Sequence, residues 1–232
     1  MSIDEKKAQE AIEYVKKNRA QLIERFTCGV KPVAKPISIF MAGSPGAGKT
    51  EFSIHLVNEI MGARDSIVRI DPDEIRLWLP QYEPGKAEVV QGAVSTAVSK
   101  IHDYVKNKSM SFLLDGTFSN PTQAISNIKL SLEKGRPVLI QYVVQPPNVA
   151  WKFTQDRESV DGRNIRREDF IRQFISARDT VSMIKKQFKN SVRIDLIERD
   201  LSTGGYKFTF DISNVDSYLP KKYSKDDLEA LV

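Results

Sequence analysis

A glycine-rich stretch early in the chain has the residue types and spacing that hold a nucleotide phosphate. The letters GSPGAGKT, residues 43–50, match the pattern G-x-x-x-x-G-K-[S/T] in full. In such a loop backbone N–H groups point inward at phosphate oxygens, Lys49 reaches the β- and γ-phosphates, and the Thr50 hydroxyl binds Mg²⁺. The alternative is an ordinary turn between a strand and a helix. The full match favours a nucleoside triphosphate site made of Gly43, Ser44, Pro45, Gly46, Ala47, Gly48, Lys49 and Thr50.

Two acids and an arginine follow the second apolar run, in the letters RIDPDEIR (residues 69–76). Ligands of an open α/β sheet gather at the carboxyl ends of its strands, so both acids should lie near the phosphates. A kinase needs a carboxylate that orients the attacking hydroxyl and accepts its proton. Asp73 or Asp71 would serve, and Arg76 would hold an anionic part of the acceptor. The alternative is that these acids cap the next helix.

A third group, FLLDGT (residues 112–117), joins a buried apolar run to a carboxylate. This arrangement is typical of a strand that delivers an acid to the metal of a phosphotransferase. Asp115 would coordinate Mg²⁺ through water or contact the acceptor, and Thr117 would offer its hydroxyl to the acceptor. The alternative is a turn that ends the strand.

An arginine-rich segment, residues 151–170, follows the fourth apolar run. Arginines on a mobile segment stabilise the charge on a transferring phosphoryl group and exclude water. We therefore expect this segment to close over the nucleotide like a lid. The alternative is a solvated helix face on which Arg157 pairs with local acids. The candidates are Arg157, Arg163, Arg166 and Arg167.

Short apolar runs alternate along the chain with longer segments of helical periodicity, which indicates a parallel sheet covered on both faces. The predicted fold is a three-layer α/β/α kinase domain over residues 37–232, preceded by an N-terminal helix and linker over 1–36. Strands are expected at 37–42, 66–70, 111–115, 137–144 and 191–197, helices at 3–26, 86–105, 167–188 and 224–231, and a late hairpin strand at 204–212.

Composition narrows the class of protein. The 232 residues suit one domain with a full core, and the net charge of +5 fits an anionic ligand such as a nucleotide. Cys28 is the single cysteine, so an intramolecular disulfide and a cysteine-based zinc cluster are excluded. No stretch approaches the roughly 20 apolar residues of a membrane span, and the cytoplasm is the expected location.

Four stretches, taken in order, resemble the zeta-toxin family of P-loop kinases over residues 37–200. They are GSPGAGKT, IDPDEIR, LLDGT and DRE…GRNIR. The resemblance implies ATP-dependent phosphorylation of the sugar 3′-hydroxyl of UDP-N-acetylglucosamine. It also implies an antitoxin partner that blocks the ATP site. By this resemblance Asp73 is the catalytic base, Lys49 the loop lysine and Asp115 the acid before Gly-Thr, and Arg157 and Arg163 are the two lid arginines, with Arg166 as an alternative to Arg163.

One departure from the family concerns the acceptor. The family often carries a sugar-contacting glutamate on the helix before the strand that ends at Asp115, and that place falls near Ser99, beside Lys100. This difference indicates a changed acceptor or a shifted alignment.

Two other functions stay open. One is a 5′-hydroxyl polynucleotide kinase, which shares the Asp-x-Asp-x-x-Arg pattern, although the chain has no aromatic and basic stretch of the kind that binds single strands. The other is a non-catalytic nucleotide-binding module. The acids at positions 71, 73 and 115 and the arginine cluster argue against it, because they are the groups that a phosphotransferase needs.

Overall fold

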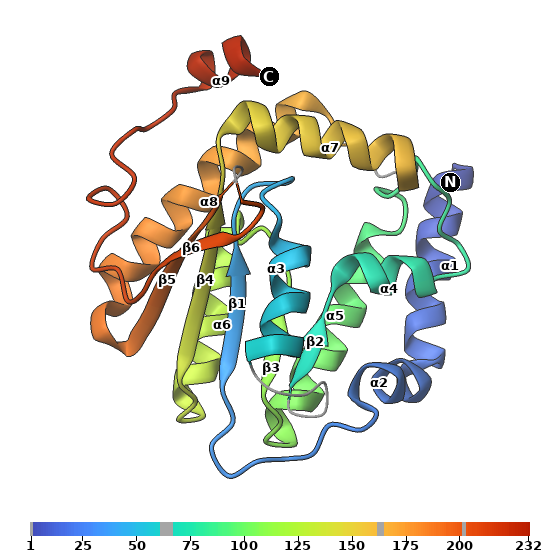
Figure 1. Cartoon of the computed structure of the whole chain (residues 1–232). Helices are drawn as coiled ribbons and strands as arrows, with labels where there is room; N and C mark the ends of the chain where they lie inside the picture. Colours follow the sequence, from blue (N-terminus) through green and yellow to red (C-terminus); the bar gives the residue numbers. More distant parts are fainter. Residues whose placement is uncertain (1, 61–66, 162–164, 201–202) are drawn as a thin grey trace.

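The computed structural model describes residues 2–60, 67–161, 165–200 and 203–232. A six-stranded sheet with the order β2-β3-β1-β4-β5-β6 forms the centre of the fold (Figure 1). All neighbouring strands are parallel except β6, which runs antiparallel to β5. The strands are β1 (Ser38–Ala42), β2 (Val68–Ile70), β3 (Phe112–Leu114), β4 (Val138–Val144), β5 (Val192–Arg199) and β6 (Tyr206–Thr209).

The central strands are apolar because both of their faces are covered. Every residue of β1 is buried, and alternate side chains enter different clusters: Phe40 packs on one face and Met41 on the other. The register places Ser38 opposite both Phe112 of β3 and Val138 of β4. The carboxyl ends of these strands therefore meet at one edge of the sheet.

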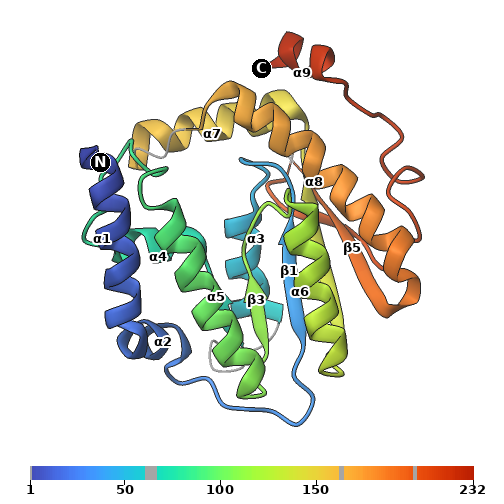
Figure 2. The ribbon, with the colours of Figure 1, turned by 180° about the vertical axis from the view of Figure 1, so that it is seen from behind.

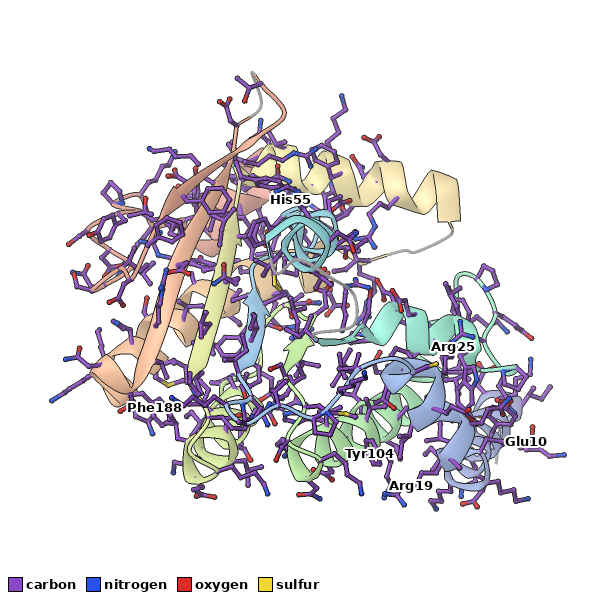
Figure 3. All side chains as sticks on the ribbon, turned by 60° about the horizontal axis from the view of Figure 1, so that its bottom comes forward. Glu10, Arg19, Arg25, His55, Tyr104 and Phe188 are labelled. Atoms are coloured by element: carbon purple, nitrogen blue, oxygen red, sulfur yellow. The ribbon has the colours of Figure 1, made fainter. Side chains whose placement is uncertain are left out.

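Helices form the two outer layers and confirm the predicted α/β/α architecture. One face carries α3 (Lys49–His55), and the other carries α5 (Gln91–Asn107), α6 (Pro121–Glu133) and α8 (Arg167–Phe188) (Figures 1 and 2). Figure 3 shows the layers from below, with His55 on the α3 side of the sheet and Tyr104 on the α5 side. Outside the N-terminal region the other elements are α4 (Pro72–Trp78), α7 (Pro147–Asp161), α9 (Lys225–Leu231), the π-helix Leu56–Ile60 and the 3₁₀-helix Lys189–Ser191.

The N-terminal helix is two helices, so the prediction of one helix over 3–26 is wrong. α1 (Ile3–Lys17) and α2 (Arg19–Thr27) are separated by Asn18, whose φ of −101° and ψ of 24° leave the helical region. Both the side-chain amide and the backbone N–H of Asn18 donate to the Tyr14 carbonyl at 2.9 Å. This double contact satisfies the end of α1 and lets the chain turn, because asparagine competes well for backbone partners.

The start of α5 also differs from its prediction at residue 86. The N–H groups of Lys86, Val89 and Gln91 each bond to a carbonyl three residues earlier, so this stretch forms turns before the helix begins at Gln91. The β6 strand and the α9 helix lie within the ranges predicted for them. In the described part of the chain, no helix is both long enough and apolar enough to cross a membrane.

Candidate functional site

The loop of residues 43–50 joins β1 to α3, the strand–loop–helix order that its motif requires. Gly43 and Gly46 have φ angles of +140° and +68°, which side-chain-bearing residues rarely adopt. A Cβ at Gly43 would lie 2.2 Å from the Val143 carbonyl oxygen, and one at Gly46 would lie 2.0 Å from that of Ala150. The loop is thus packed against the end of β4 and the start of α7, and only glycine fits at these two positions.

Lys49 opens α3 and turns back toward the loop. Its ammonium group donates to the Ser44 carbonyl at 2.6 Å. Burial lowers the pKa of this ammonium group to about 8, and the nearby Asp115 carboxylate opposes the shift only in part. The group is therefore a cation with too few anionic partners, which is the electrostatic condition for binding an anionic ligand.

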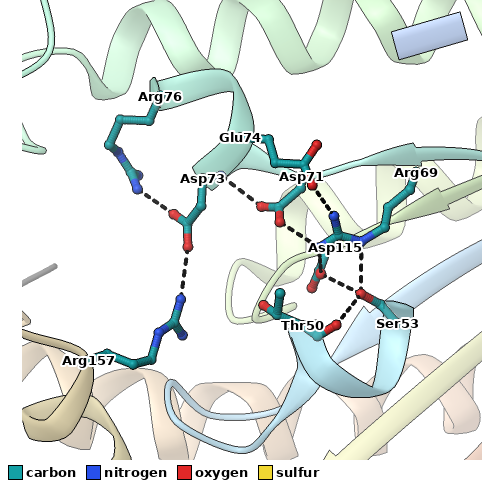
Figure 4. A network of polar contacts seen from close by, with 9 residues as sticks. All are labelled: Thr50, Ser53, Arg69, Asp71, Asp73, Glu74, Arg76, Asp115 and Arg157. Atoms are coloured by element: carbon teal, nitrogen blue, oxygen red, sulfur yellow. Dashed lines mark hydrogen bonds and ion pairs between the residues drawn. The ribbon is translucent and has the colours of Figure 1, made fainter. Parts of the chain in front are cut away.

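The two acids after β2 face different surroundings (Figure 4). Asp71 is buried, and its Oδ1 accepts a hydrogen bond from the Asp73 backbone N–H at 2.8 Å, so it caps α4. The helix-cap alternative therefore describes Asp71. Burial, followed by repulsion from Asp115, raises the pKa of this carboxyl above its ordinary value.

Asp73 projects from the first turn of α4, and its side chain is about one third exposed. Its Oδ1 accepts a hydrogen bond from Arg76 on the same helix, and its Oδ2 lies 3.4 Å from Nη2 of Arg157 on α7. A second nitrogen of Arg76 donates to Gln91 at 3.2 Å. The structure thus brings Arg157, 84 positions away in the sequence, to Asp73 and Arg76 of α4. Of the two acids Asp73 is the more open to a ligand (Figure 4).

Asp115 and Thr117 follow β3 and lie beside the phosphate loop. Oδ2 of Asp115 lies 2.9 Å from both the Ser53 hydroxyl and Nη2 of Arg69. The Thr117 carbonyl accepts a hydrogen bond from the Gly43 N–H at 3.2 Å, and its hydroxyl pairs with that of Ser119. Thr117 therefore supports the loop through its backbone.

The arginines of segment 151–170 divide into two groups. Arg157 reaches across to Asp73, whereas Arg166 pairs with Asp169 at 2.8 Å and Arg167 donates to the Val232 carbonyl at 2.7 Å. The alternative paired Arg157 with local acids, whereas its contact with Asp73 is to a different helix, α4. Arg166 and Arg167 contact their own helix and the C-terminal segment. Arg163 lies outside the described residues, so its predicted role stays a prediction.

Sequence reasoning missed two residues that hold the site together. Arg69 donates from β2 to both Asp71 and Asp115, and Ser53 on α3 contacts Asp115. Alternation along a strand was an available signal, because residues 69 and 71 must lie on the same side of the sheet.

Ser99, the α5 position near which the place of the family's glutamate falls, has only a hydrogen-bond contact within its own helix among the described residues. Ser99 is exposed, and its hydroxyl donates to the Ser95 carbonyl of its own helix. Gln91, roughly two turns earlier, is the α5 side chain bonded to Arg76.

Comparison with protein families supports a kinase-like assignment for this arrangement. The family model described as zeta toxin matches residues 6–208, which is most of the chain. Among curated proteins, an ATP-binding subunit of an ATP-dependent Clp protease, ClpE of Bacillus subtilis (strain 168), is 38% identical over 56 residues. The chain spans only 8% of that relative's length, so this short match transfers no activity.

Solved structures share the fold. A structure of the PezAT chromosomal toxin–antitoxin system of Streptococcus pneumoniae matches with a TM-score of 0.68 and 22% identity, over 93% of this chain and 85% of that one. The AvrRxo1-ORF1:-ORF2 complex with ATP matches with a TM-score of 0.62 and 15% identity, over 93% and 71%. The Pnkp1/Rnl/Hen1 RNA repair complex matches with a TM-score of 0.51 and 16% identity, over 79% and 50%.

Proposed function

The chain belongs to the zeta toxin family, and from this premise we propose that it is a kinase that transfers the γ-phosphate of ATP to a hydroxyl of a UDP-amino sugar. UDP-N-acetylglucosamine is the expected acceptor. The observation that carries the proposal is the position of Asp73, which is part-exposed and held between Arg76 and Arg157 at the sheet edge that also carries the phosphate loop. A carboxylate so placed suits the orientation of an acceptor hydroxyl.

The phosphate loop and Lys49 would bind the triphosphate. Thr50 and Asp115, which share the Ser53 hydroxyl as a hydrogen-bond partner (Figure 4), would hold Mg²⁺. Asp115 fits the role of a metal ligand. Its Oδ2 is bonded to Ser53 and Arg69, while its Oδ1 has no hydrogen bond from the described residues. The described residues contain no cluster of three acidic, histidine or cysteine ligands, so phosphate oxygens and water would complete the coordination, as is usual for Mg²⁺. When bound, the ion neutralises charge on the phosphates.

Asp73 would accept the proton of the acceptor hydroxyl as that oxygen attacks the γ-phosphorus. Arg76 would fix the carboxylate and contact an anionic part of the acceptor. Arg157 pairs with Asp73 at 3.4 Å, and it would exchange this partner for γ-phosphate oxygens when ATP binds, leaving Asp73 for the acceptor. Negative charge grows on those oxygens during transfer, so the exchange would be strongest in the transition state.

Replacing Arg157 with alanine is expected to lower turnover by about 10²-fold or more while changing ATP affinity by less than about tenfold. Turnover would be measured as ADP release and affinity by titration calorimetry. Arg166→Ala is the matched control, because Arg166 belongs to the same segment but pairs with Asp169. Equal losses of rate and affinity in Arg157→Ala would show that Arg157 contributes only ground-state binding.

ATP affinity is expected to fall as the pH rises above about 8. The Lys49 ammonium has a pKa of about 8 in the free protein, and a bound triphosphate would raise it by favouring the charged form. Below pH 8 Lys49 is already protonated, so affinity changes little. Above it, binding must take up a proton, and affinity falls by up to about tenfold per pH unit. Calorimetry across this range tests the effect, and Lys49→Ala should bind ATP more weakly with no such slope.

Rates of ADP release with different acceptors test the proposal. A UDP-sugar should stimulate ADP release with only mild sensitivity to salt, because its contacts are few and local. A 5′-hydroxyl oligonucleotide would require many phosphate contacts, and its turnover would fall steeply as salt rises. Stimulation by the oligonucleotide alone would replace the proposal with polynucleotide kinase activity, and ATP binding without stimulation by either would favour a non-catalytic nucleotide-binding module.

An antitoxin protein that covers the ATP site is the expected partner. The match to the PezAT toxin–antitoxin system supports this part of the proposal at the level of the fold.

A further inference from the structure

Arg69 lies at the centre of a group of three carboxylates. Its Nη2 is 2.5 Å from Oδ2 of Asp71 and 2.9 Å from Oδ2 of Asp115, and its Nη1 donates to Glu74. Its Nε donates to the Ser53 hydroxyl at 2.9 Å. The side chain is only 13% exposed, so this guanidinium is a largely buried cation shared by acids from two neighbouring strands and the helix α4 (Figure 4).

The position of this cation bears on metal binding. Two carboxylates at the ends of adjacent strands, one oxygen of each facing the same point, form an arrangement that attracts a divalent cation. A guanidinium nitrogen occupies that point here, bonded to Asp71 and Asp115 together. The negative charge of the two acids is therefore partly neutralised before any metal arrives.

The same contacts fix the orientation of Asp115. Oδ2 is held from two directions, by Ser53 on α3 and by Arg69 on β2, so these two hydrogen bonds restrain the orientation of the carboxylate. This leaves Oδ1 as the oxygen that can face a cation bound to Thr50 and to phosphate. A single available carboxylate oxygen and one hydroxyl bind Mg²⁺ weakly without additional oxygen ligands.

We propose that Arg69 is a positioning residue that makes divalent-cation binding depend on the nucleotide. Its guanidinium occupies the position between Asp71 and Asp115 and holds Asp115 by one oxygen, so that a cation enters only together with the triphosphate oxygens. This inference rests on the proposed function in one respect, the assignment of Mg²⁺ to Asp115.

The test measures Mn²⁺ binding in the absence of nucleotide, by the electron paramagnetic resonance signal of free Mn²⁺. The variant Arg69→Met removes the charge and keeps much of the side-chain length, and Arg69→Lys keeps the charge. The parent and Arg69→Lys are expected to leave Mn²⁺ free. Arg69→Met should bind one Mn²⁺ ion per chain at least about tenfold more tightly than the parent does, because Asp71 and Asp115 would then face each other with no cation between them. Adding Asp71→Asn to Arg69→Met should abolish the gained binding.

Two results would overturn the inference: equal Mn²⁺ binding by Arg69→Met and the parent, or gained binding that persists with Asp71→Asn. If Arg69→Met is destabilised without metal, its thermal unfolding midpoint should rise with Mn²⁺ concentration, because a ligand that binds the folded state stabilises it. A midpoint that does not respond to Mn²⁺ would equally overturn it. ATP binding by the parent, measured separately, reports on the proposed function, so the two failures are distinguishable.

Discussion

Replacing Lys49 with alanine is expected to reduce phosphoryl transfer by at least about 10²–10³-fold and to leave the fold intact. The loop path is set by Gly43 and Gly46 and by packing against Val143 and Ala150, so the lysine is not needed to form it. Within the described part of the chain its ammonium donates to the Ser44 carbonyl and otherwise meets long-range charges, and its burial lowers its pKa to about 8. Removing this cation should therefore cost the folded chain little.

The measurement is ADP release together with the thermal unfolding midpoint. Lys152→Ala is the control, because Lys152 is an exposed lysine on α7. Turnover at the parent rate in Lys49→Ala would show that the nucleotide site is misassigned. A lower midpoint would show instead that the lysine supports the fold.

Replacing Asp73 with asparagine is expected to preserve ATP binding and lower turnover by about 10²-fold or more, as for the loss of a positioned base. Asparagine keeps the size of the side chain and its contact with Arg76, but it cannot take the proton of an attacking hydroxyl. Turnover and ATP affinity should be measured on the same preparation.

Asp71→Asn is the matched control for Asp73→Asn, because both remove one charge from neighbouring acids. An asparagine at position 71 still caps α4, but it loses the ion pair with Arg69. We expect reduced stability and an altered metal dependence, with a smaller effect on the chemical step. The reverse pattern, with catalysis lost in Asp71→Asn and kept in Asp73→Asn, would assign the base to Asp71.

The architecture of the sheet could be predicted from the sequence because its signals are local. Apolar runs of strand length, a complete phosphate-loop pattern and acids at the ends of two runs locate the edge of the sheet without any knowledge of distant contacts. The break at Asn18 was missed because the apolar period continues on both sides of it, and the contacts of Asn18 with the Tyr14 carbonyl that end the first helix leave no mark on that period.

The pairing of charges in the site was harder to predict. Arg157 reaches Asp73 across 84 positions of sequence, whereas Arg166 and Arg167, from the same segment, turn to Asp169 and the C-terminal segment. Charge and composition alone do not separate these arginines, because the difference comes from how α7 and α8 are packed. The role of Arg69 was hidden for the same reason, since its partner Asp115 belongs to another strand.

Transfer of the γ-phosphate of ATP to a UDP-amino sugar can be observed in its product. The decisive measurement is mass spectrometry of UDP-N-acetylglucosamine incubated with the protein, ATP and Mg²⁺. We expect a product heavier by one phosphoryl group, formed by the parent and nearly absent with Asp73→Asn. Phosphate transferred to a 5′-hydroxyl oligonucleotide, with no UDP-sugar modified, would contradict it.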